Sequence, residues 1–158
     1  MIHYDKNGSP FEIRAYVYKD YLYLEAMYEA FKPKAMFQGM PPKDKDVAAR
    51  WIKKLVQNGE NILAWQKDKV AGHVVILPDY EKKDAEYLIF VSQSARGTGI
   101  GKELTLAAIK KAAELGMQVI WLTVDAYNFR ATKLYRKIGF EFCEGYSSSS
   151  ERMMIMKL

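Results

Sequence analysis

A strand that leads into a glycine-rich turn and then a helix constrains this chain more than any other stretch. Residues 86–91 (Glu-Tyr-Leu-Ile-Phe-Val) form a mostly apolar run that is too short for a buried helix, so they predict a buried strand. Glycines follow at positions 97, 99 and 101, and apolar residues then recur at helical spacing. In such a segment the unpaired N–H groups of the first helical turn bind anions, and glycines let a ligand approach the backbone. The stretch therefore predicts a site for a phosphate compound.

Composition limits the class of protein in which this site would operate. A chain of 158 residues is expected to form one domain, and none of its segments reaches the ~18 apolar residues of a membrane span. No long apolar run opens the chain, so a cytoplasmic protein is expected. The single cysteine and two histidines do not favour a metal site, and the formal charge of +5 is too dispersed for a nucleic-acid-binding arm.

Periodicity and turn residues predict an α+β fold. The expected strands cover residues 11–18, 61–66, 70–77, 85–91, 119–124, 140–143 and 153–158, and the expected helices cover 21–31, 44–57, 99–115 and 128–137. The strand–helix–strand unit over residues 85–124 should form one parallel, right-handed crossover in a mostly antiparallel sheet of about seven strands. In the loop 34–42, Met36, Phe37 and Met40 could line a lid or pack into the core, and both interpretations stay open.

Two common phosphate-binding motifs can be tested against the spacing of the turn. A Walker loop requires Gly-x4-Gly-Lys-Ser/Thr, but Arg96 stands at the first glycine position and Glu103 at the hydroxyl position. A dinucleotide fingerprint requires Gly-x-Gly-x-x-Gly, whereas the three glycines here are spaced two residues apart. The turn is therefore neither a nucleoside-triphosphate loop nor a dinucleotide fingerprint.

The turn instead fits the pattern Arg/Gln-x-x-Gly-x-Gly/Ala, with Arg96, Gly99 and Gly101 at the defined positions. Residues 128–140 fit a second pattern, Asn-x-x-Ala-x-x-Leu-Tyr-x-x-x-Gly-Phe, at every position. Together these motifs resemble the GNAT superfamily of N-acetyltransferases, closely over residues 85–140 and by element order elsewhere. The resemblance implies a GNAT-type α+β fold with helices on both faces of the sheet, and acetyl-CoA as cosubstrate without a metal.

The resemblance also implies roles for individual residues. Backbone N–H groups of the turn would hold the coenzyme pyrophosphate, and the strand backbone at Phe90 and Val91 would pair with the pantetheine arm. The Val91 N–H would polarise the thioester carbonyl. Asn128 would contact the same arm, although a helix N-cap alone would account for it. The residues assigned to the coenzyme are Phe90, Val91, Arg96, Gly97, Thr98, Gly99, Ile100, Gly101, Lys102, Asn128 and Arg130.

The catalytic acid and base are constrained to different degrees. By resemblance, Tyr135 would protonate the departing thiolate, and the alternative is an aromatic core residue with a polar tip. Glu86 is the candidate base because it begins the central strand, and His73 on a neighbouring strand is the alternative, with water as a further one. Cys143 is expected to be a small buried residue rather than a nucleophile. Arg130 and Lys133 could reach the nucleotide phosphates or form a solvated helix face.

The sequence therefore predicts an N-acetyltransferase that moves an acetyl group directly from acetyl-CoA to a primary amine in a ternary complex. No motif identifies the acceptor. The alternative is a catalytically silent module that binds coenzyme A as a sensor or interaction domain, and a nucleic-acid binder fits the dispersed charges less well. Homodimers are common among relatives, but no residue here indicates one, and no membrane partner is expected.

Overall fold

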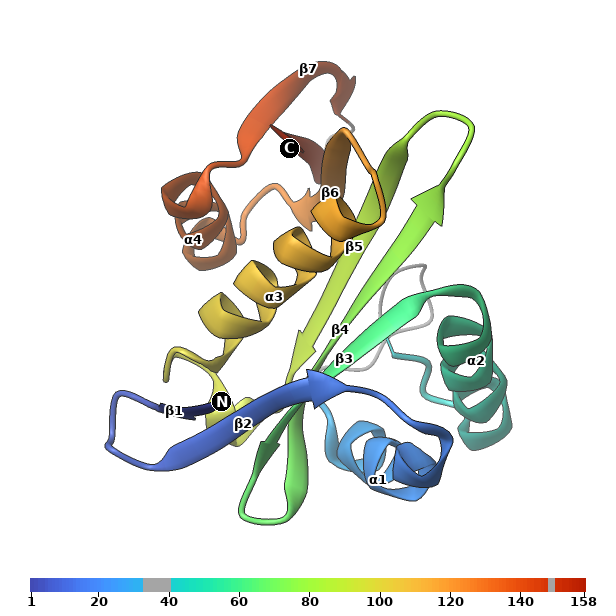
Figure 1. Cartoon of the computed structure of the whole chain (residues 1–158), viewed down its shortest axis with the longest axis vertical. Helices are drawn as coiled ribbons and strands as arrows, with labels where there is room; N and C mark the ends of the chain where they lie inside the picture. The colour runs from blue at the N-terminus through green and yellow to red at the C-terminus, as the bar shows by residue number, and fades with distance from the viewer. Residues whose placement is uncertain (33–40, 148–149) are drawn as a thin grey trace. The chain divides into compact units, whose positions relative to one another are not determined.

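The computed structural model describes residues 1–32, 41–147 and 150–158. Within them, eight strands form one sheet, in the order β1 (Ile2–Tyr4), β2 (Pro10–Ala15), β3 (Glu60–Gln66), β4 (Lys69–Asp79), β5 (Asp84–Val91), β6 (Val119–Asp125), β8 (Glu151–Lys157) and β7 (Glu141–Ser147) (Figure 1). The pairs β1–β2, β2–β3, β3–β4, β6–β8 and β7–β8 are antiparallel, and β5–β6 is parallel. The predicted α+β class is confirmed, and the strand beyond the expected seven is β1.

Four α-helices accompany the strands: α1 (Tyr21–Ala30), α2 (Lys45–Asn58), α3 (Ile100–Glu114) and α4 (Phe129–Ile138). Two short 3-10 helices, η1 (Tyr18–Asp20) and η2 (Gln93–Ala95), precede α1 and follow β5. The chain divides into two compact units, of which the first comprises residues 1–76 and 88–108 and the second residues 77–87 and 109–158. The strands β4 and β5 and the helix α3 each contribute residues to both units.

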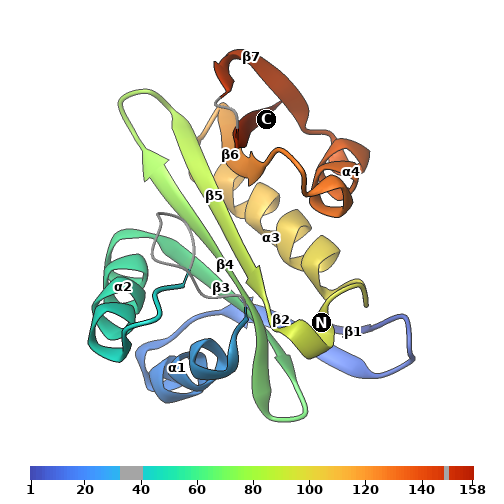
Figure 2. The same cartoon turned by 180° about the vertical axis from the view of Figure 1, so that it is seen from behind.

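In the first unit, α1 and α2 share a core with strands β3, β4 and β5. The two helices lie side by side next to β3 (Figures 1 and 2). Asp44 begins α2, because its carboxylate accepts a hydrogen bond from the Val47 N–H at 2.9 Å. The buried side chains that form this core are Leu24, Met27, Tyr28, Phe31, Ile52, Leu63, Val70 and Phe90.

A close approach in the first unit fixes the start of α3 against β4. A Cβ added to Gly72 of β4 would lie 2.6 Å from Leu104 Cδ1 and 3.6 Å from Ile100 Cγ2. Both of these α3 side chains are fully buried. Glycine at position 72 therefore lets the first turns of α3 pack directly on the strand, and this helix follows the glycine-rich turn.

In the second unit, β5 pairs with β6 at Glu86–Trp121 and two preceding positions, and β6 pairs along its whole length with β8. Asn128 caps α4, because its side-chain oxygen accepts from the Ala131 N–H at 3.1 Å. Gly139 ends the helix with φ +133°, a conformation that favours glycine. The N-cap predicted at Asn128 is confirmed.

Most of the loop 34–42, for which a lid was one interpretation, lies outside the described residues. In the three described ranges, no helix has both the length and the apolar character needed to cross a membrane.

Candidate functional site

The glycine-rich turn lies in the first unit, between η2 and α3. Gly97 and Gly99 have φ values of +74° and +102°, which side chains of L-residues rarely allow. A Cβ on Gly99 would have no heavy atom within 4 Å. The backbone conformation, and not crowding, therefore requires glycine at position 99, and the open space beside it leaves room for a ligand.

Two hydrogen bonds hold the turn in this conformation, and a further contact lies at the start of α3. The Thr98 hydroxyl donates to the Ala95 carbonyl at 2.6 Å, and the Lys6 N–H donates to the Thr98 carbonyl at 2.8 Å. His3 Nδ1 lies 3.6 Å from a carboxylate oxygen of Glu103 on the first turn of α3. The sequence motif predicts the turn itself, but its attachment to the residues around β1 has no signal in the motif.

The start of α3 has the chemistry of an anion site. Helix geometry leaves the N–H groups of Ile100, Gly101 and Lys102 without intrahelical acceptors, and the helix dipole places partial positive charge there. A Cβ on Gly101 would lie 3.6 Å from Val91 Cγ2, an ordinary contact, so position 101 is less restricted than position 99. Backbone donors beside open space fit a pyrophosphate group.

The Arg96 side chain is directed at protein carbonyls. Its Nε donates to the Val91 carbonyl at 3.0 Å, and one of its terminal nitrogens donates to the Lys32 carbonyl. The guanidinium carbon also lies 5.0 Å from the ring centroid of Phe31. Desolvation lowers the pKa of Arg96 from its ordinary value, but guanidinium groups remain charged at neutral pH.

Tyr135 is buried in an aromatic group of the second unit. Its ring makes edge contacts with Tyr87 and Phe140 at centroid distances of 6.0 Å and 5.9 Å. Desolvation raises the pKa of Tyr135 to about 12, against a smaller opposing effect of its hydrogen bond with Tyr87. The phenol is therefore protonated at neutral pH and able to donate a proton.

Asn128 and Arg130 lie at the exposed start of α4. The N-cap uses the side-chain oxygen of Asn128, so its NH2 group is the part that can donate to a ligand. Arg130 and Lys133 are both exposed on α4, and the two interpretations of these cations stay open.

Glu86 belongs to the second unit and pairs with Trp121 across β5–β6. Its side chain is half-buried, and desolvation raises the pKa of this carboxyl above its ordinary value. A raised pKa makes the carboxylate a stronger base, as proton abstraction from an ammonium or amine requires.

His73 lies in a closed chain of hydrogen bonds in the first unit and is fully buried. The Tyr28 hydroxyl lies 2.6 Å from His73 Nδ1, and His73 Nε2 lies 2.7 Å from Asn61 Oδ1. Because the amide oxygen of Asn61 only accepts, Nε2 carries the proton and the Tyr28 hydroxyl donates to Nδ1. Burial lowers the pKa of His73 to about 3. Both ring nitrogens are occupied, so the geometry favours Glu86 over His73 as a base.

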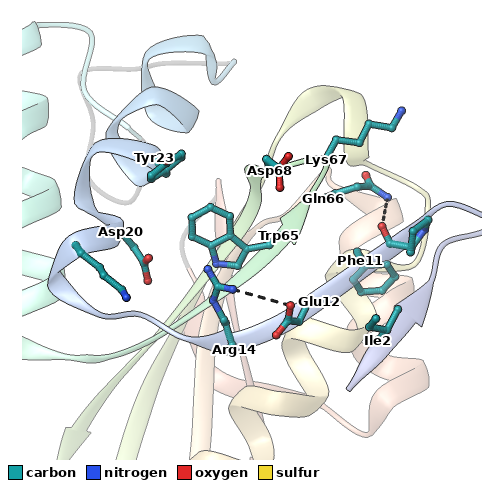
Figure 3. A pocket seen from close by; sticks show the side chains of 12 residues that line it. Ile2, Phe11, Glu12, Arg14, Asp20, Tyr23, Trp65, Gln66, Lys67 and Asp68 are labelled. Atoms are coloured by element: carbon teal, nitrogen blue, oxygen red, sulfur yellow. Dashed lines mark hydrogen bonds and ion pairs between the residues drawn. The ribbon is translucent and has the colours of Figure 1, made fainter.

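A separate hollow of about 860 Å³ in the first unit contains none of the predicted site residues. Figure 3 shows it between β2, the β3–β4 hairpin and the start of α1, with Arg14 over Trp65; the guanidinium carbon lies 4.4 Å from the ring centroid.

Of the side chains that the structure describes, no group of three or more His, Cys, Asp or Glu could hold a metal ion.

The predicted site residues thus divide between the two units. The first unit holds Phe90, Val91 and the turn 96–102, and the second holds Glu86, Asn128, Arg130 and Tyr135. Cys143 lies half-buried on β7, also in the second unit. The sequence does not predict the hydrogen bonds of the Arg96 side chain or the hydrogen-bonded series Tyr28–His73–Asn61. No local sequence pattern marks a contact between distant segments.

Comparisons with known proteins agree with the two motifs. The family model described as "Acetyltransferase (GNAT) family" matches residues 24–140. Mycothiol acetyltransferase of Pseudarthrobacter chlorophenolicus is 46% identical over 54 residues, which are 34% of this chain and 17% of that protein. The chain therefore spans only a small part of that relative's length.

Solved structures show the same fold. The GNAT domain of PAT from S. lividans superposes with a TM-score of 0.85 at 14% identity, over 100% of this chain and 96% of that domain. The yncA protein of Salmonella typhimurium, solved with its cofactor acetyl-CoA, gives a TM-score of 0.73 at 16% identity over 94% of each chain.

Proposed function

Because this chain belongs to the acetyltransferase (GNAT) family, we propose that it transfers an acetyl group from acetyl-CoA directly to a primary amine. The observation that carries the proposal is the turn before α3, where Gly97 and Gly99 have positive φ values and Gly99 borders open space next to the backbone N–H groups of the helix start. This arrangement supports binding of the coenzyme pyrophosphate. In the proposal the chain forms one acetyltransferase domain over residues 1–158, located in the cytoplasm.

The donor would be held mainly by backbone groups. The N–H groups of residues 97–102 would bind the pyrophosphate, with the charge of Lys102 in support. The Arg96 N–H is left out of this set, because it donates to the Gln93 carbonyl at 3.4 Å. The backbone at Phe90 and Val91 would pair with the pantetheine arm, and the Val91 N–H would stabilise the oxyanion that develops on the thioester carbonyl. Asn128 would donate from its NH2 group to the same arm, and Arg130 would contact a nucleotide phosphate.

Two side chains would move protons during the transfer. The amine nitrogen attacks the thioester carbonyl carbon and loses a proton to Glu86, directly or through water. The C–S bond breaks, and Tyr135 donates its phenolic proton to the departing sulfur. The raised pKa of Glu86 supports its role as a base, and Tyr135 stays protonated at neutral pH and so has a proton to donate. No covalent enzyme intermediate is needed, so Cys143 has no part in the reaction.

The test is release of free thiol from acetyl-CoA in the presence of a panel of primary amines. The panel should contain polyamines, amino acids, amino sugars and peptides with free N-termini. We expect saturable thiol release with at least one amine, and one acetylated amine for each thiol. Saturable coenzyme binding without transfer to any amine would instead identify a catalytically silent binding module.

A further inference from the structure

Arg96 joins three segments of the first unit that are far apart in the sequence. Its Nε donates to the carbonyl of Val91, the last residue of β5, and a terminal nitrogen donates to the carbonyl of Lys32. The guanidinium carbon lies over the ring of Phe31, which is the C-cap residue of α1. One side chain of the glycine-rich turn therefore contacts the end of a strand and the end of a helix.

These contacts suit arginine and no other cation. The planar guanidinium carries donors that point in different directions, so it can bind two carbonyls and still stack on a ring. Lysine has one compact ammonium group and cannot reproduce this fork. The Lys32 carbonyl also follows directly after the C-terminal end of α1, where the helix dipole favours a positive charge.

The strand end that Arg96 contacts is the part of β5 on which the proposed reaction depends. Phe90 is buried against Tyr28, Phe31 and Trp51, with ring centroids 5.3–6.0 Å apart. The Ser92 N–H donates to the Ala71 carbonyl at 2.8 Å, which ties the residue after the strand to β4. Arg96 adds a further restraint, because it holds the Val91 carbonyl from the side of the turn.

Resting on the proposed function, we infer that Arg96 is a positioning residue and not a phosphate ligand. It clamps the end of β5 to the end of α1 and so fixes the backbone of Val91 for the thioester. The clamp should matter to any donor that carries the thioester, whether or not that donor has a pyrophosphate. A phosphate ligand, in contrast, would matter only to donors that contain phosphate.

The experiment compares two acetyl donors on the full chain. Acetyl-CoA carries the pyrophosphate, whereas S-acetylpantetheine carries the same thioester arm without phosphates or nucleotide. The wild type, Arg96→Ala, Arg96→Lys and Arg14→Ala are assayed with one amine that the wild type accepts. Arg14 is the matched control, because its guanidinium also stacks on an aromatic ring, that of Trp65, and it has no part in the proposed site.

We expect both Arg96 variants to lower kcat/KM about tenfold with each donor, by the same factor, mainly through kcat. Arg14→Ala should stay near the wild type. The inference is overturned if the loss is confined to acetyl-CoA, or if Arg96→Lys restores wild-type kinetics, since either result identifies a charge contact with phosphate.

Amide hydrogen exchange without coenzyme tests the clamp independently of activity. The Phe31 N–H donates to the Tyr28 carbonyl at 3.3 Å and the Ala95 N–H to the Ser92 carbonyl at 2.9 Å, so both report on the clamped segments. Both should exchange faster in the two Arg96 variants than in Arg14→Ala, and unchanged exchange would overturn the clamp. If the wild type acetylates no amine, the proposed function fails, but exchange still decides the role of Arg96.

Discussion

The glycine-rich turn of the first unit and helix α4 of the second carry the two family motifs, but they use their residues differently. In the turn, the positive φ at position 99 requires glycine, and no heavy atom would lie within 4 Å of a Cβ at that position. In α4, Asn128 caps the helix, Tyr135 packs among aromatic rings and Gly139 ends the helix. Gly99 of the first motif thus encodes backbone shape, whereas Asn128, Tyr135 and Gly139 of the second motif have structural roles in their helix and core.

This difference decides which substitutions are informative. A substitution at a glycine of the turn should alter the affinity for coenzyme because it moves several backbone N–H groups at once. It removes no single side-chain group. A change in α4 can affect stability and chemistry together, and a matched variant is needed to separate them. The following predictions test the comparison in order of expected effect.

The largest effect is expected for Tyr135→Phe, which removes the proposed acid and keeps the ring. We expect kcat to fall about 100-fold while KM for acetyl-CoA changes little, because the loss of a positioned acid acts in the transition state. Tyr87→Phe is the control, since it removes the neighbouring hydroxyl from the same aromatic group. A kcat for Tyr135→Phe equal to that of the wild type would leave Tyr135 a core residue only.

A smaller effect is expected for Gly99→Ala, measured as the Kd for acetyl-CoA. Forcing alanine to a φ of +102° should cost about 1 kcal/mol of stability and shift the backbone donors, with a loss of about tenfold in affinity. Gly8→Ala is the control, because Gly8 has a φ of +82° and equally open surroundings outside the site. Equal affinity in the two variants would contradict a role for the turn in binding.

Asn128→Ala should lower the free energy of unfolding by about 1 kcal/mol through loss of the N-cap. Asn128→Ser should restore most of this stability, since serine also caps helices, but it lacks the NH2 group proposed to contact the pantetheine arm. Urea denaturation and kcat/KM are measured for both variants. Full recovery of kcat/KM in Asn128→Ser would show that Asn128 is only a cap.

The smallest effect is expected in the pH profile of kcat/KM. Glu86 must be ionised to act as a base, so activity should fall as the pH drops through its raised pKa, and Glu86→Gln should remove this fall. Tyr135 must be protonated to act as an acid, and its pKa of about 12 predicts no alkaline fall between pH 7 and pH 10. An alkaline fall in that range that disappears in Tyr135→Phe would contradict the assignment.

The helices and strands that the sequence predicts are those whose formation depends on residues close together in the chain. Asp44 and Asn128 stand at the starts of two expected helices, and both cap those helices in the structure, because a cap depends on residues next to each other in the chain. The sequence does not indicate β1, since its three residues have no periodic pattern and form a strand by pairing with β2.

The parts of the site that could not be predicted depend on contacts between distant segments. The chain Tyr28–His73–Asn61 spans 45 and 12 residues of sequence in its two hydrogen bonds. The partner of Arg96 at Lys32 is 64 residues away. A sequence pattern reports residue types and spacing, but it does not report which carbonyl a side chain will meet.

Isothermal titration of the wild-type chain with acetyl-CoA tests the central claim most directly. The proposed function predicts saturable binding with one coenzyme per chain, and the comparison predicts weaker binding in Gly99→Ala but not in Gly8→Ala. Absence of saturable binding by the folded wild type would contradict an acetyl-CoA-dependent transferase.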